Sequence, residues 1–236
     1  MASKIPGNEK DSICVLVSGG ADSAILLCEM AKTYRKVVPL FVRSGHLWEE
    51  AELYWLGRFL KAAAHPAIKP LQVLALPMED VYHTHWSMTG REIPDYASTW
   101  VDVYLPGRNL ILLSKTAVFC ALNDIHAVAL GPLKTNRFAD SSLAFFSGLR
   151  KVVELGLSTK LEILTPFSEK DKHEILRLGR DLPLELTFSC LNPIENRHCG
   201  ACNKCAERIE AFGEAGIPDR TVYHDRDFAV RRSEDN

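Results

Sequence analysis

Two groups of residues in this chain have the types and spacing to do chemistry. The first is Val17-Ser18-Gly19-Gly20-Ala21-Asp22-Ser23, where two glycines stand among small hydroxyl and carboxyl side chains. The second is a set of four cysteines, Cys190, Cys199, Cys202 and Cys205. The N–H groups of a glycine turn suit a phosphate, and cysteine sulfurs suit a metal ion. The chain therefore has a candidate anion site and a candidate metal site.

The glycine stretch lies between an apolar run, Ile13 to Val17, and a segment of helical character, Ala24 to Tyr34. We predict a strand, a tight turn and the start of a helix. The glycines would let the backbone turn sharply and approach a ligand closely. Asp22 or Ser23 could cap the helix, whose free N–H groups and dipole would face an anion. These features predict a phosphate-binding loop.

The loop matches neither of the two common nucleotide-binding patterns. The chain contains no Gly-x-x-x-x-Gly-Lys-Ser/Thr and no Gly-x-Gly-x-x-Gly. Ser-Gly-Gly-x-Asp-Ser instead resembles the pyrophosphate loop of the N-type ATP pyrophosphatases. That resemblance implies that ATP is cut between its α- and β-phosphates and that AMP is placed on a substrate oxygen.

The four cysteines form the pattern Cys-x8-Cys-x2-Cys-x2-Cys. Zn²⁺ in structural sites takes four such ligands in a tetrahedron, which leaves no open position for a substrate. We therefore predict a structural zinc ion. His198 could replace one cysteine, and an iron–sulfur cluster, free thiols or a redox pair are the alternative interpretations.

Composition limits the classes of protein that the chain can represent. Its 236 residues, 47% of them hydrophobic, suit one domain with an appendage or two small domains. The net charge of −2 predicts no nucleic-acid partner and no anionic membrane surface. The polar start, Met1 to Lys10, lacks a signal-peptide core, and no run reaches the ~18 apolar residues of a membrane span. Since Cys14, Cys28 and Cys120 lie in apolar stretches, the cysteines indicate a reducing compartment, and we predict a cytoplasmic protein.

Apolar runs alternate with helical segments along the chain, and these elements must position both sites. The alternation predicts an α/β fold with a doubly wound, five-stranded parallel sheet. Ligands in such folds bind beyond the carboxyl ends of the strands, at a switch in strand order. In the helix predicted over 47–64, the expected buried face is Ala51, Trp55, Phe59 and Ala63. The predicted strands are 13–17, 36–42, 71–76, 126–130 and 161–164, and the other predicted helices are 24–34, 110–122, 141–155, 168–178 and one through Phe212.

We divide the chain into three parts. They are a nucleotide-binding domain over 1–180, a zinc-binding C-terminal lobe over 181–224 and a charged, solvated tail over 225–236. The irregular stretch 77–104 has no predicted role, although its aromatic residues could stack on a base or form their own small core. The functional loops should follow strands, at 18–23, 43–48, 77–109, 131–140 and 165–172.

The phosphate loop and the cysteine cluster together resemble the 7-cyano-7-deazaguanine synthases of queuosine biosynthesis. Three further segments carry the resemblance, which covers about residues 12–213. They are Leu105-Pro106-Gly107-Arg108-Asn109, then Thr165-Pro166-Phe167 with Lys172, Glu174 and Ile175, and the zinc segment with Arg208 and Phe212. Ser44-Gly45-His46 matches the family's Tyr-Gly-Gln-Arg-His segment only in part.

The resemblance implies an ATP-dependent ligase that needs Mg²⁺ to bridge the phosphates. A deazaguanine carboxylic acid would be adenylated, ammonia would displace AMP to give an amide, and a second ATP would drive formation of the nitrile. The small-molecule partners would be that acid and ammonia. The sequence leaves the oligomeric state open, a homodimer included.

The resemblance also implies roles for individual residues. Ser18, Gly19, Gly20, Asp22 and Ser23 would hold the ATP phosphates, and Gly107, Arg108 and Asn109 would line the cleft for ATP and substrate. Arg108 could pair with a phosphate or carboxylate, and Lys172 could neutralise phosphate charge. The expected catalytic residues are Asp22, Ser23, Arg108 and Lys172, and the expected substrate-binding residues are His46, Gly131 and Asp140.

The chain departs from the family pattern in three places, and one of them leaves the identity of the acid open. The loop from Gly131 to Asn136 differs from the family's loop, and the stretch before Pro106 is longer. Where the family has Asp-Cys-Arg-x-Glu-Phe, this chain has Asp140-Ser141-Ser142-Leu143-Ala144-Phe145. A related ligase that uses another acid, or stops at the amide, is therefore the alternative hypothesis. A tRNA-modifying sulfur transferase and a non-enzymatic nucleotide-binding module are more distant alternatives. His83-x-His85 is better explained by local packing or by a role in a substrate lid than by metal binding.

Overall fold

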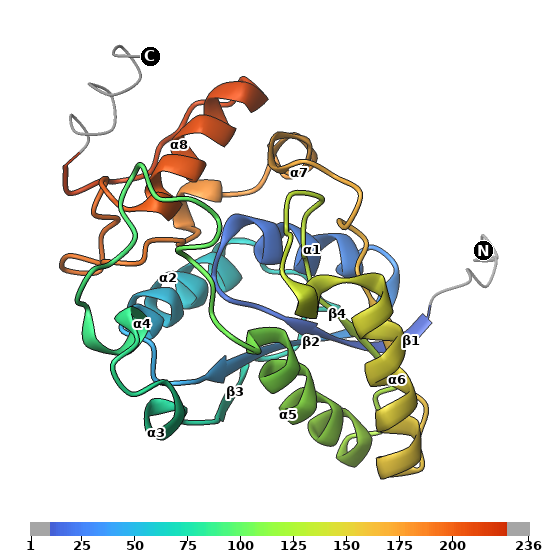
Figure 1. Cartoon of the computed structure of the whole chain (residues 1–236). Helices are drawn as coiled ribbons and strands as arrows, with labels where there is room; N and C mark the ends of the chain where they lie inside the picture. Colours follow the sequence, from blue (N-terminus) through green and yellow to red (C-terminus); the bar gives the residue numbers. More distant parts are fainter. Residues whose placement is uncertain (1–9, 226–236) are drawn as a thin grey trace, which may run out of the picture.

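The computed structural model describes residues 10–225, and a five-stranded sheet lies at its centre (Figure 1). All strand pairs are parallel and the strand order is β3-β2-β1-β4-β5. Apart from its first residue, the predicted tail 225–236 lies outside the described residues. The strands are β1 (Lys10–Leu16), β2 (Tyr34–Arg43), β3 (Gln72–Ala75), β4 (Ala127–Ala129) and β5 (Glu162–Leu164).

Helices cover both faces of the sheet, which confirms the predicted doubly wound α/β fold (Figure 1). Alternate residues of β1 point to opposite faces, as the period of a strand requires. Ile13 and Val15 join the core beneath α1, α2, α7 and α8, whereas Cys14 and Leu16 join the core beneath α5 and α6. The helices are α1 (Ala21–Ala31), α2 (Glu49–Ala62), α3 (Glu79–Tyr82), α4 (Trp86–Thr89), α5 (Arg108–Leu122), α6 (Leu143–Leu157), α7 (Lys172–Leu178) and α8 (Asn203–Ala215).

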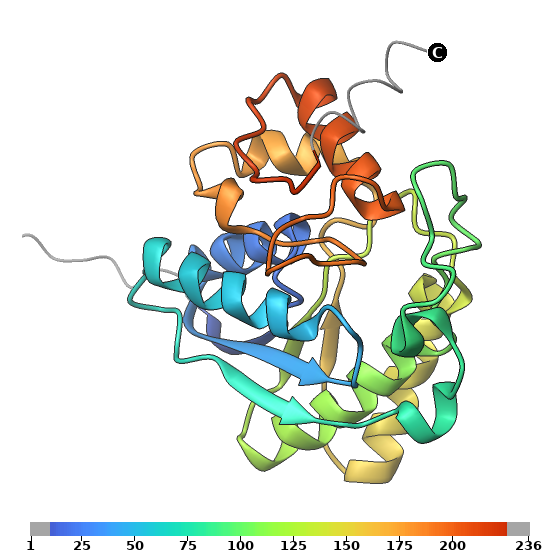
Figure 2. The ribbon, with the colours of Figure 1, turned by 90° about the vertical axis from the view of Figure 1, so that its left-hand side faces the viewer.

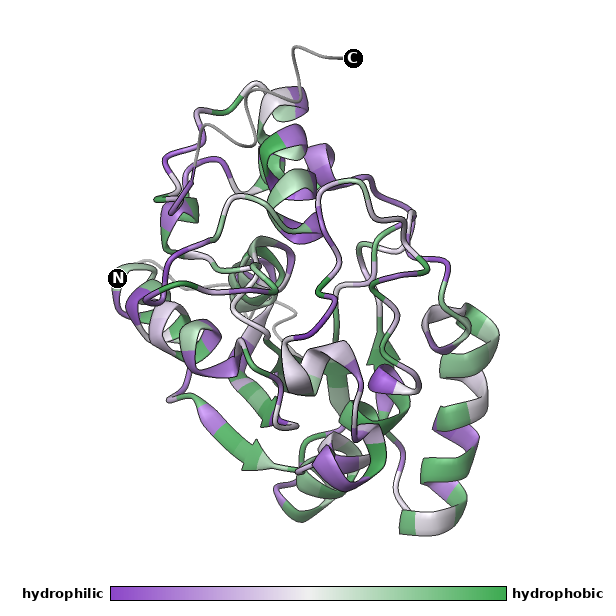
Figure 3. Cartoon of the chain, turned by 60° about the vertical axis from the view of Figure 1, so that its left-hand side comes forward, coloured by the Kyte–Doolittle hydropathy of each residue, from purple (hydrophilic) through white to green (hydrophobic). Residues whose placement is uncertain are grey.

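Hydropathy follows this layering. Figure 3 shows apolar residues concentrated in the strands, whereas the helices mix apolar and polar positions. Central strands of a parallel sheet are covered on both faces, so nearly every β2 position from Val37 to Val42 is apolar and buried.

The order of the strands creates a switch point between β1 and β4. The chain adds β2 and then β3 on one side of β1, and later adds β4 and β5 on the other side. The loops after β1 and β4 therefore leave the same edge of the sheet in opposite directions, and a crevice opens between them. This places the stretch 18–23 beside Gly131, because the carbonyl oxygen of Asp22 lies 3.8 Å from the position of a Cβ at Gly131.

The buried face of α2 differs in part from the prediction. Ala51 and Phe59 are buried as expected, but Trp55 is only partly buried and Leu56 is fully buried. A helix has about 3.6 residues per turn, so a stripe of residues spaced by four drifts away from the core. The face that packs on the sheet alternates steps of three and four and runs through Glu49, Glu52, Leu56 and Phe59.

The cysteine segment, residues 188–205, packs against the long stretch after β3, residues 76–107, which contains α3 and α4. A third apolar cluster combines Trp48, Val103 and Leu105 with the four cysteines. The backbone N–H of Asn203 donates to Pro94 at 3.0 Å, and Asp95 forms a β-bridge with Cys202. Figures 1 and 2 both show the two segments side by side above the sheet. The division of the chain at residue 180 stays a prediction.

No helix within residues 10–225 has the length and apolar character needed to cross a membrane.

Replacing Leu56 should destabilise the fold strongly, because its side chain is completely buried between α2 and the sheet. We expect Leu56→Ala to lower the free energy of unfolding by about 2–5 kcal/mol, measured by urea denaturation. The matched control is Leu155→Ala on α6, since that side chain is 84% exposed and should change stability by less than about 0.5 kcal/mol. Equal effects of the two substitutions would contradict the assigned core.

Candidate active site

The turn after β1 is shaped by the close approach of two other segments. Gly19 has φ +81°, and a Cβ at this position would lie 3.0 Å from the backbone oxygen of Glu52. The carbonyl of Gly19 accepts a 2.7 Å hydrogen bond from the N–H of Phe188. Only glycine satisfies both the left-handed conformation and the lack of space. The turn is therefore clamped between α2 and the cysteine segment.

Hydroxyl groups close the turn from inside. The Ser23 hydroxyl donates to the carbonyl of Gly20 at 3.0 Å and accepts from the N–H of Ser18 at 3.2 Å. The predicted capping by Asp22 or Ser23 is wrong, because α1 begins at Ala21 with Gly20 as its N-cap and no side-chain cap. Asp22 and Ser23 lie within the first turn, whose N–H groups have no intrahelical acceptor and could donate to a bound anion.

Two adjoining cavities meet at this turn, and a third, of about 380 Å³, lies beside them and also reaches Asp22 and Lys172. The larger of the adjoining pair measures about 280 Å³ and extends to the cysteine segment. The smaller of the pair measures about 200 Å³ and lies between the ends of β1, β2 and β4. Most of the predicted site residues line at least one of them; Gly19 and Gly107 line neither and shape the backbone instead. Both cavities are lined by Ser18, Gly20, Asp22, Glu52, Arg108, Asn109 and Asn136.

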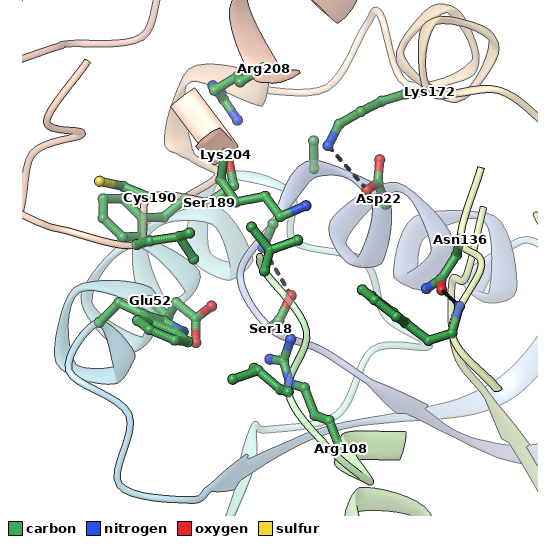
Figure 4. A pocket seen from close by; sticks show the side chains of 18 of the residues that line it. Ser18, Asp22, Glu52, Arg108, Asn136, Lys172, Ser189, Cys190, Lys204 and Arg208 are labelled. Carbon is green, nitrogen blue, oxygen red and sulfur yellow. Dashed lines mark hydrogen bonds and ion pairs between the residues drawn. The ribbon is translucent and has the colours of Figure 1, made fainter. Parts of the chain in front are cut away.

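Two cationic side chains converge on the cavities from different helices. Arg108 is the first residue of α5, and Lys172 is the first residue of α7. The Nζ atom of Lys172 lies 3.6 Å from Oδ2 of Asp22 (Figure 4). Both positions are helix N-termini, where a positive side chain has no favourable interaction with the helix dipole. Two positive side chains that converge on one space suit a bound polyanion.

Asp22 carries a buried oxygen that has no hydrogen-bond partner among the described residues. Oδ2 faces Lys172, but Oδ1 is buried and unpaired. An orphaned carboxylate oxygen beside a phosphate-type turn fits Mg²⁺, which prefers hard oxygen ligands and usually combines one or two carboxylates with phosphate oxygens.

His46 lines the smaller cavity and is 6% exposed. Its ring stacks on Trp48, with centroids 4.9 Å apart, and its Nδ1 has no hydrogen-bond partner among the described residues. Burial, and then the charge of Arg108 and the neighbouring His85, lower the pKa of His46 to about 3. The imidazole is therefore neutral at physiological pH.

Asp140 and Gly131 both lie at the cavities, but Asp140 is partly engaged within the protein. Its Oδ2 accepts a 2.8 Å hydrogen bond from the N–H of Asn109, and its carbonyl accepts one from the Asn109 amide at 3.0 Å. Asp140 thus holds the first turn of α5, and with it the backbone of Arg108. Gly131 lines the smaller cavity beside Phe41 and Leu130.

The four cysteines meet as one group. Their Sγ atoms all lie within 4.8 Å of one another and all four residues are buried. This donor set and its separation fit a tetrahedral metal ion. His198 is not part of the group, and its Nε2 accepts a 3.2 Å hydrogen bond from the N–H of Ser189. His83 and His85 are likewise outside the group, and His85 caps α4.

Several lining residues were not predicted. Glu52 is the most unexpected, because it is an acidic residue at 7% exposure on the apolar face of α2. Its spacing from Leu56 and Phe59 is the signal that could have revealed it, since those positions share one face of a helix. Trp86, one of the aromatic residues of the stretch 77–104, stacks on Trp48 with ring centroids 5.5 Å apart and also lines the larger cavity. Other unpredicted lining residues are Trp48, Ser189 and Lys204.

The profile of the family described as "Queuosine biosynthesis protein QueC" matches residues 12–216. The chain belongs to the QueC family. The matched range contains the glycine turn, the lining residues of both cavities and all four cysteines of the QueC chain.

Curated relatives of this QueC chain agree with that assignment. A protein named 7-cyano-7-deazaguanine synthase from Methanospirillum hungatei is 30% identical over 221 residues, which is 90% of this chain and 99% of the relative. A protein of the same name from Methanocaldococcus jannaschii is 30% identical over 229 residues, which is 88% of this chain and 97% of the relative. Among solved structures, the U34-tRNA thiolase NcsA from Methanococcus maripaludis has 14% identity and a TM-score of 0.49, covering 87% of this chain and 65% of its own, a likeness that says nothing about function.

The neutral state of His46 in this QueC chain has a measurable consequence for stability. Below its usual pKa near 6.5, the unfolded chain binds a proton at His46 that the folded chain does not, so folding stability falls as pH falls. We expect His46→Gln to lose about 2 kcal/mol less stability between pH 7 and pH 5 than the parent protein, measured by urea denaturation at each pH. If stability changes equally with pH in the two proteins, His46 is protonated between pH 7 and pH 5 as readily in the folded chain as in the unfolded chain.

Proposed function

We propose that the chain is an ATP-dependent carbon–nitrogen ligase that adenylates a deazaguanine carboxylic acid and converts it with ammonia to the amide and then the nitrile. One observation carries the proposal: the glycine turn forms the shared wall of two adjoining cavities. An adenylating enzyme needs that arrangement, because the acid must reach the α-phosphate of ATP. The names of the curated relatives support the choice of acid.

The two cavities differ in a way that suits two different ligands. The smaller has apolar walls from Val17, Phe41 and Leu130, which suit an adenine ring. The larger has aromatic walls from Trp48 and Phe188 and opens toward Lys172. We assign the smaller cavity to the nucleoside of ATP, the turn to its phosphates and the larger cavity to the acid.

The reaction needs activation because a carboxylate oxygen is a poor leaving group. The acid would attack the α-phosphorus of ATP, releasing pyrophosphate and forming an acyl adenylate. Ammonia would then attack the carbonyl carbon, AMP would leave with the electron pair of the broken C–O bond, and one proton would be released. The amide oxygen would then attack the α-phosphorus of a second ATP and release a second pyrophosphate. Loss of AMP, together with the two N–H protons, would leave the nitrile.

The residues of the chain would act mainly by holding and neutralising charge. The N–H groups of the turn would donate to phosphate oxygens, with Lys172 and Arg108 balancing their negative charge. Asp22 would orient Lys172 and offer its unpaired oxygen to Mg²⁺, which supplies further neutralisation of the phosphates when bound. Such preorganised electrostatic groups account for much of the rate enhancement in phosphoryl chemistry.

The four cysteines would hold a structural Zn²⁺. Cys190 also lines the larger cavity, so the metal would stabilise one wall of the acid site. We also propose that a domain boundary lies near residue 180, that the protein is cytoplasmic and that it has no nucleic-acid partner.

A ligase that stops at the amide or uses a related acid is the second candidate, since the family's Asp-Cys-Arg-x-Glu-Phe segment is absent here. Ala144, which stands at the position of the family's glutamate, is exposed and lines neither of the two cavities. Sulfur transfer is disfavoured, because Cys14, Cys28 and Cys120 line neither cavity and could not reach a nucleotide there.

Product analysis tests the proposal directly. Purified protein given ATP, Mg²⁺, ammonium and the deazaguanine acid should release pyrophosphate and AMP and form the amide and the nitrile, both identified by mass spectrometry. Amide without nitrile would favour the second candidate. Bound ATP without pyrophosphate release, with every acid in a panel of purine-like acids, would refute the ligase.

Asp22→Ala provides the matched variant for the same assay. We expect pyrophosphate release to fall at least about 100-fold, because Lys172 keeps only Glu207 of its two carboxylate partners and the phosphates lose a metal ligand. Metal content should not change, since Asp22 is not part of the cysteine group. Asp80→Ala, an exposed position on α3 that lines neither cavity, is the control and should keep full activity.

Metal analysis tests the cysteine cluster separately. We expect about one zinc ion per chain in protein purified without chelator, because the four thiolates complete a structural site. Cys202→Ser should lower zinc content and the unfolding temperature, whereas Cys28→Ser, outside the cluster, should leave the zinc content unchanged. Iron in place of zinc, or no metal at all, would contradict the assignment.

A further inference from the structure

Glu52 is a buried carboxylate that the chemistry above does not use. It lies on α2 at 7% exposure and borders both cavities. Figure 4 shows its carboxylate directed into the space between Ser18 and the cysteine segment. Its position is fixed by packing, because α2 lies on the sheet through Leu56 and Phe59. The backbone oxygen of Glu52 also lies close to Gly19.

The Glu52 carboxylate forms no hydrogen bond or ion pair with residues 10–225. The charges that shift its pKa are those of the Arg108 guanidinium and the Glu49 carboxylate. The Glu49 oxygens are already occupied by the N–H groups of Ser44 and Gly45, at 2.7 and 3.1 Å. Burying an unpaired carboxylate destabilises a protein unless a partner arrives. A ligand with hydrogen-bond donors would supply that partner.

The other cavity-lining carboxylates cannot fill this role as well. Asp140 uses Oδ2 on the N–H of Asn109, and Asp22 faces Lys172 at the phosphate turn. Glu52 alone among these three lies beside aromatic walls with both oxygens unoccupied, next to Trp48 and Phe188. A planar heterocycle can pack against such walls and present one edge to the carboxylate.

We propose that Glu52 is the specificity-determining residue for a guanine-type base, accepting hydrogen bonds from the ring N1–H and the exocyclic 2-amino group of the acid. The proposal rests on the function given above and adds the base edge that selects the substrate. A carboxylate has two acceptor oxygens spaced to match two parallel donors. A base without the 2-amino group offers only one donor to this pair.

The electrostatics of the site agree with this role. Burial raises the pKa of Glu52 well above its usual value, opposed by Arg108 and reinforced by Glu49. Donors from a bound base favour the charged carboxylate and would lower that pKa again. A site that pairs a desolvated acceptor with ligand donors rejects ligands lacking a donor, because the acceptor then stays unpaired.

Binding without turnover tests the proposal. Isothermal titration should compare 7-deazaguanine-7-carboxylic acid with 7-deazahypoxanthine-7-carboxylic acid, which lacks only the 2-amino group. We expect the parent protein to bind the first acid about 10- to 100-fold more tightly, the range for one charge-assisted hydrogen bond. Glu52→Gln should reduce this preference to less than about 3-fold, because its amide N–H₂ group faces the donors of the base.

Glu50→Gln is the matched control. Glu50 neighbours Glu52 on α2, but its side chain is 74% exposed and pairs with Arg43 outside the cavities. This variant should keep the parental preference. Circular dichroism of all three proteins checks folding. If Glu52→Gln does not fold, Glu52→Ala takes its place in the same comparison and should lose the preference as well. Equal affinity of the parent protein for both acids would overturn the proposal.

The outcomes separate this proposal from the assigned function. A 2-amino preference that Glu52→Gln abolishes supports the role of Glu52, even in a protein that releases no pyrophosphate. A preference unchanged by Glu52→Gln overturns it. Glu52→Gln could also lower turnover equally with both acids while leaving the binding affinities of both unchanged. That result would overturn the proposal and would assign Glu52 a role in proton transfer instead.

Discussion

The structure depends on the clamp around Gly19. The backbone there has φ +81°, its carbonyl accepts the Phe188 N–H at 2.7 Å, and there is no room for a side chain against Glu52. This single residue fixes β1, α2 and the cysteine segment relative to one another. Both cavities border the segments that it joins, so their shape follows from a steric constraint at one glycine.

The cysteine cluster continues this construction away from the sheet. Its buried thiols lie in one apolar cluster with Trp48, Val103 and Leu105, which come from α2 and from the stretch after β3. Neither the long stretch nor the cysteine segment has enough regular structure to be stable alone. Their mutual packing, strengthened by a metal ion when bound, gives the larger cavity rigid walls.

Charge in the site is arranged in two zones. Asp22 and Lys172 face each other at the phosphate turn, at 3.6 Å, where a polyanion and a metal ion would bind. Glu52 and the neutral His46 are buried beside the aromatic ring of Trp48 or in contact with it. The two zones therefore offer a ligand environments of different polarity.

The sequence by itself determined the features that depend on local chemistry. Strand and helix periodicity predicted the doubly wound sheet, the glycine turn predicted the strand–turn–helix junction, and the cysteine spacing predicted a four-sulfur site, which the structure brings together within 4.8 Å. These predictions succeed because neighbours in the chain are enough to produce the pattern.

The tertiary structure alone decided the rest. It showed that Asp22 and Ser23 lie inside the helix instead of capping it. It also showed that one carboxylate oxygen of Asp140 accepts a hydrogen bond from the first turn of α5. It also revealed Glu52, whose position at both cavities depends on how α2 rotates against the sheet. Such features result from contacts between residues far apart in the chain, and no local pattern specifies which face of a helix will meet a cavity.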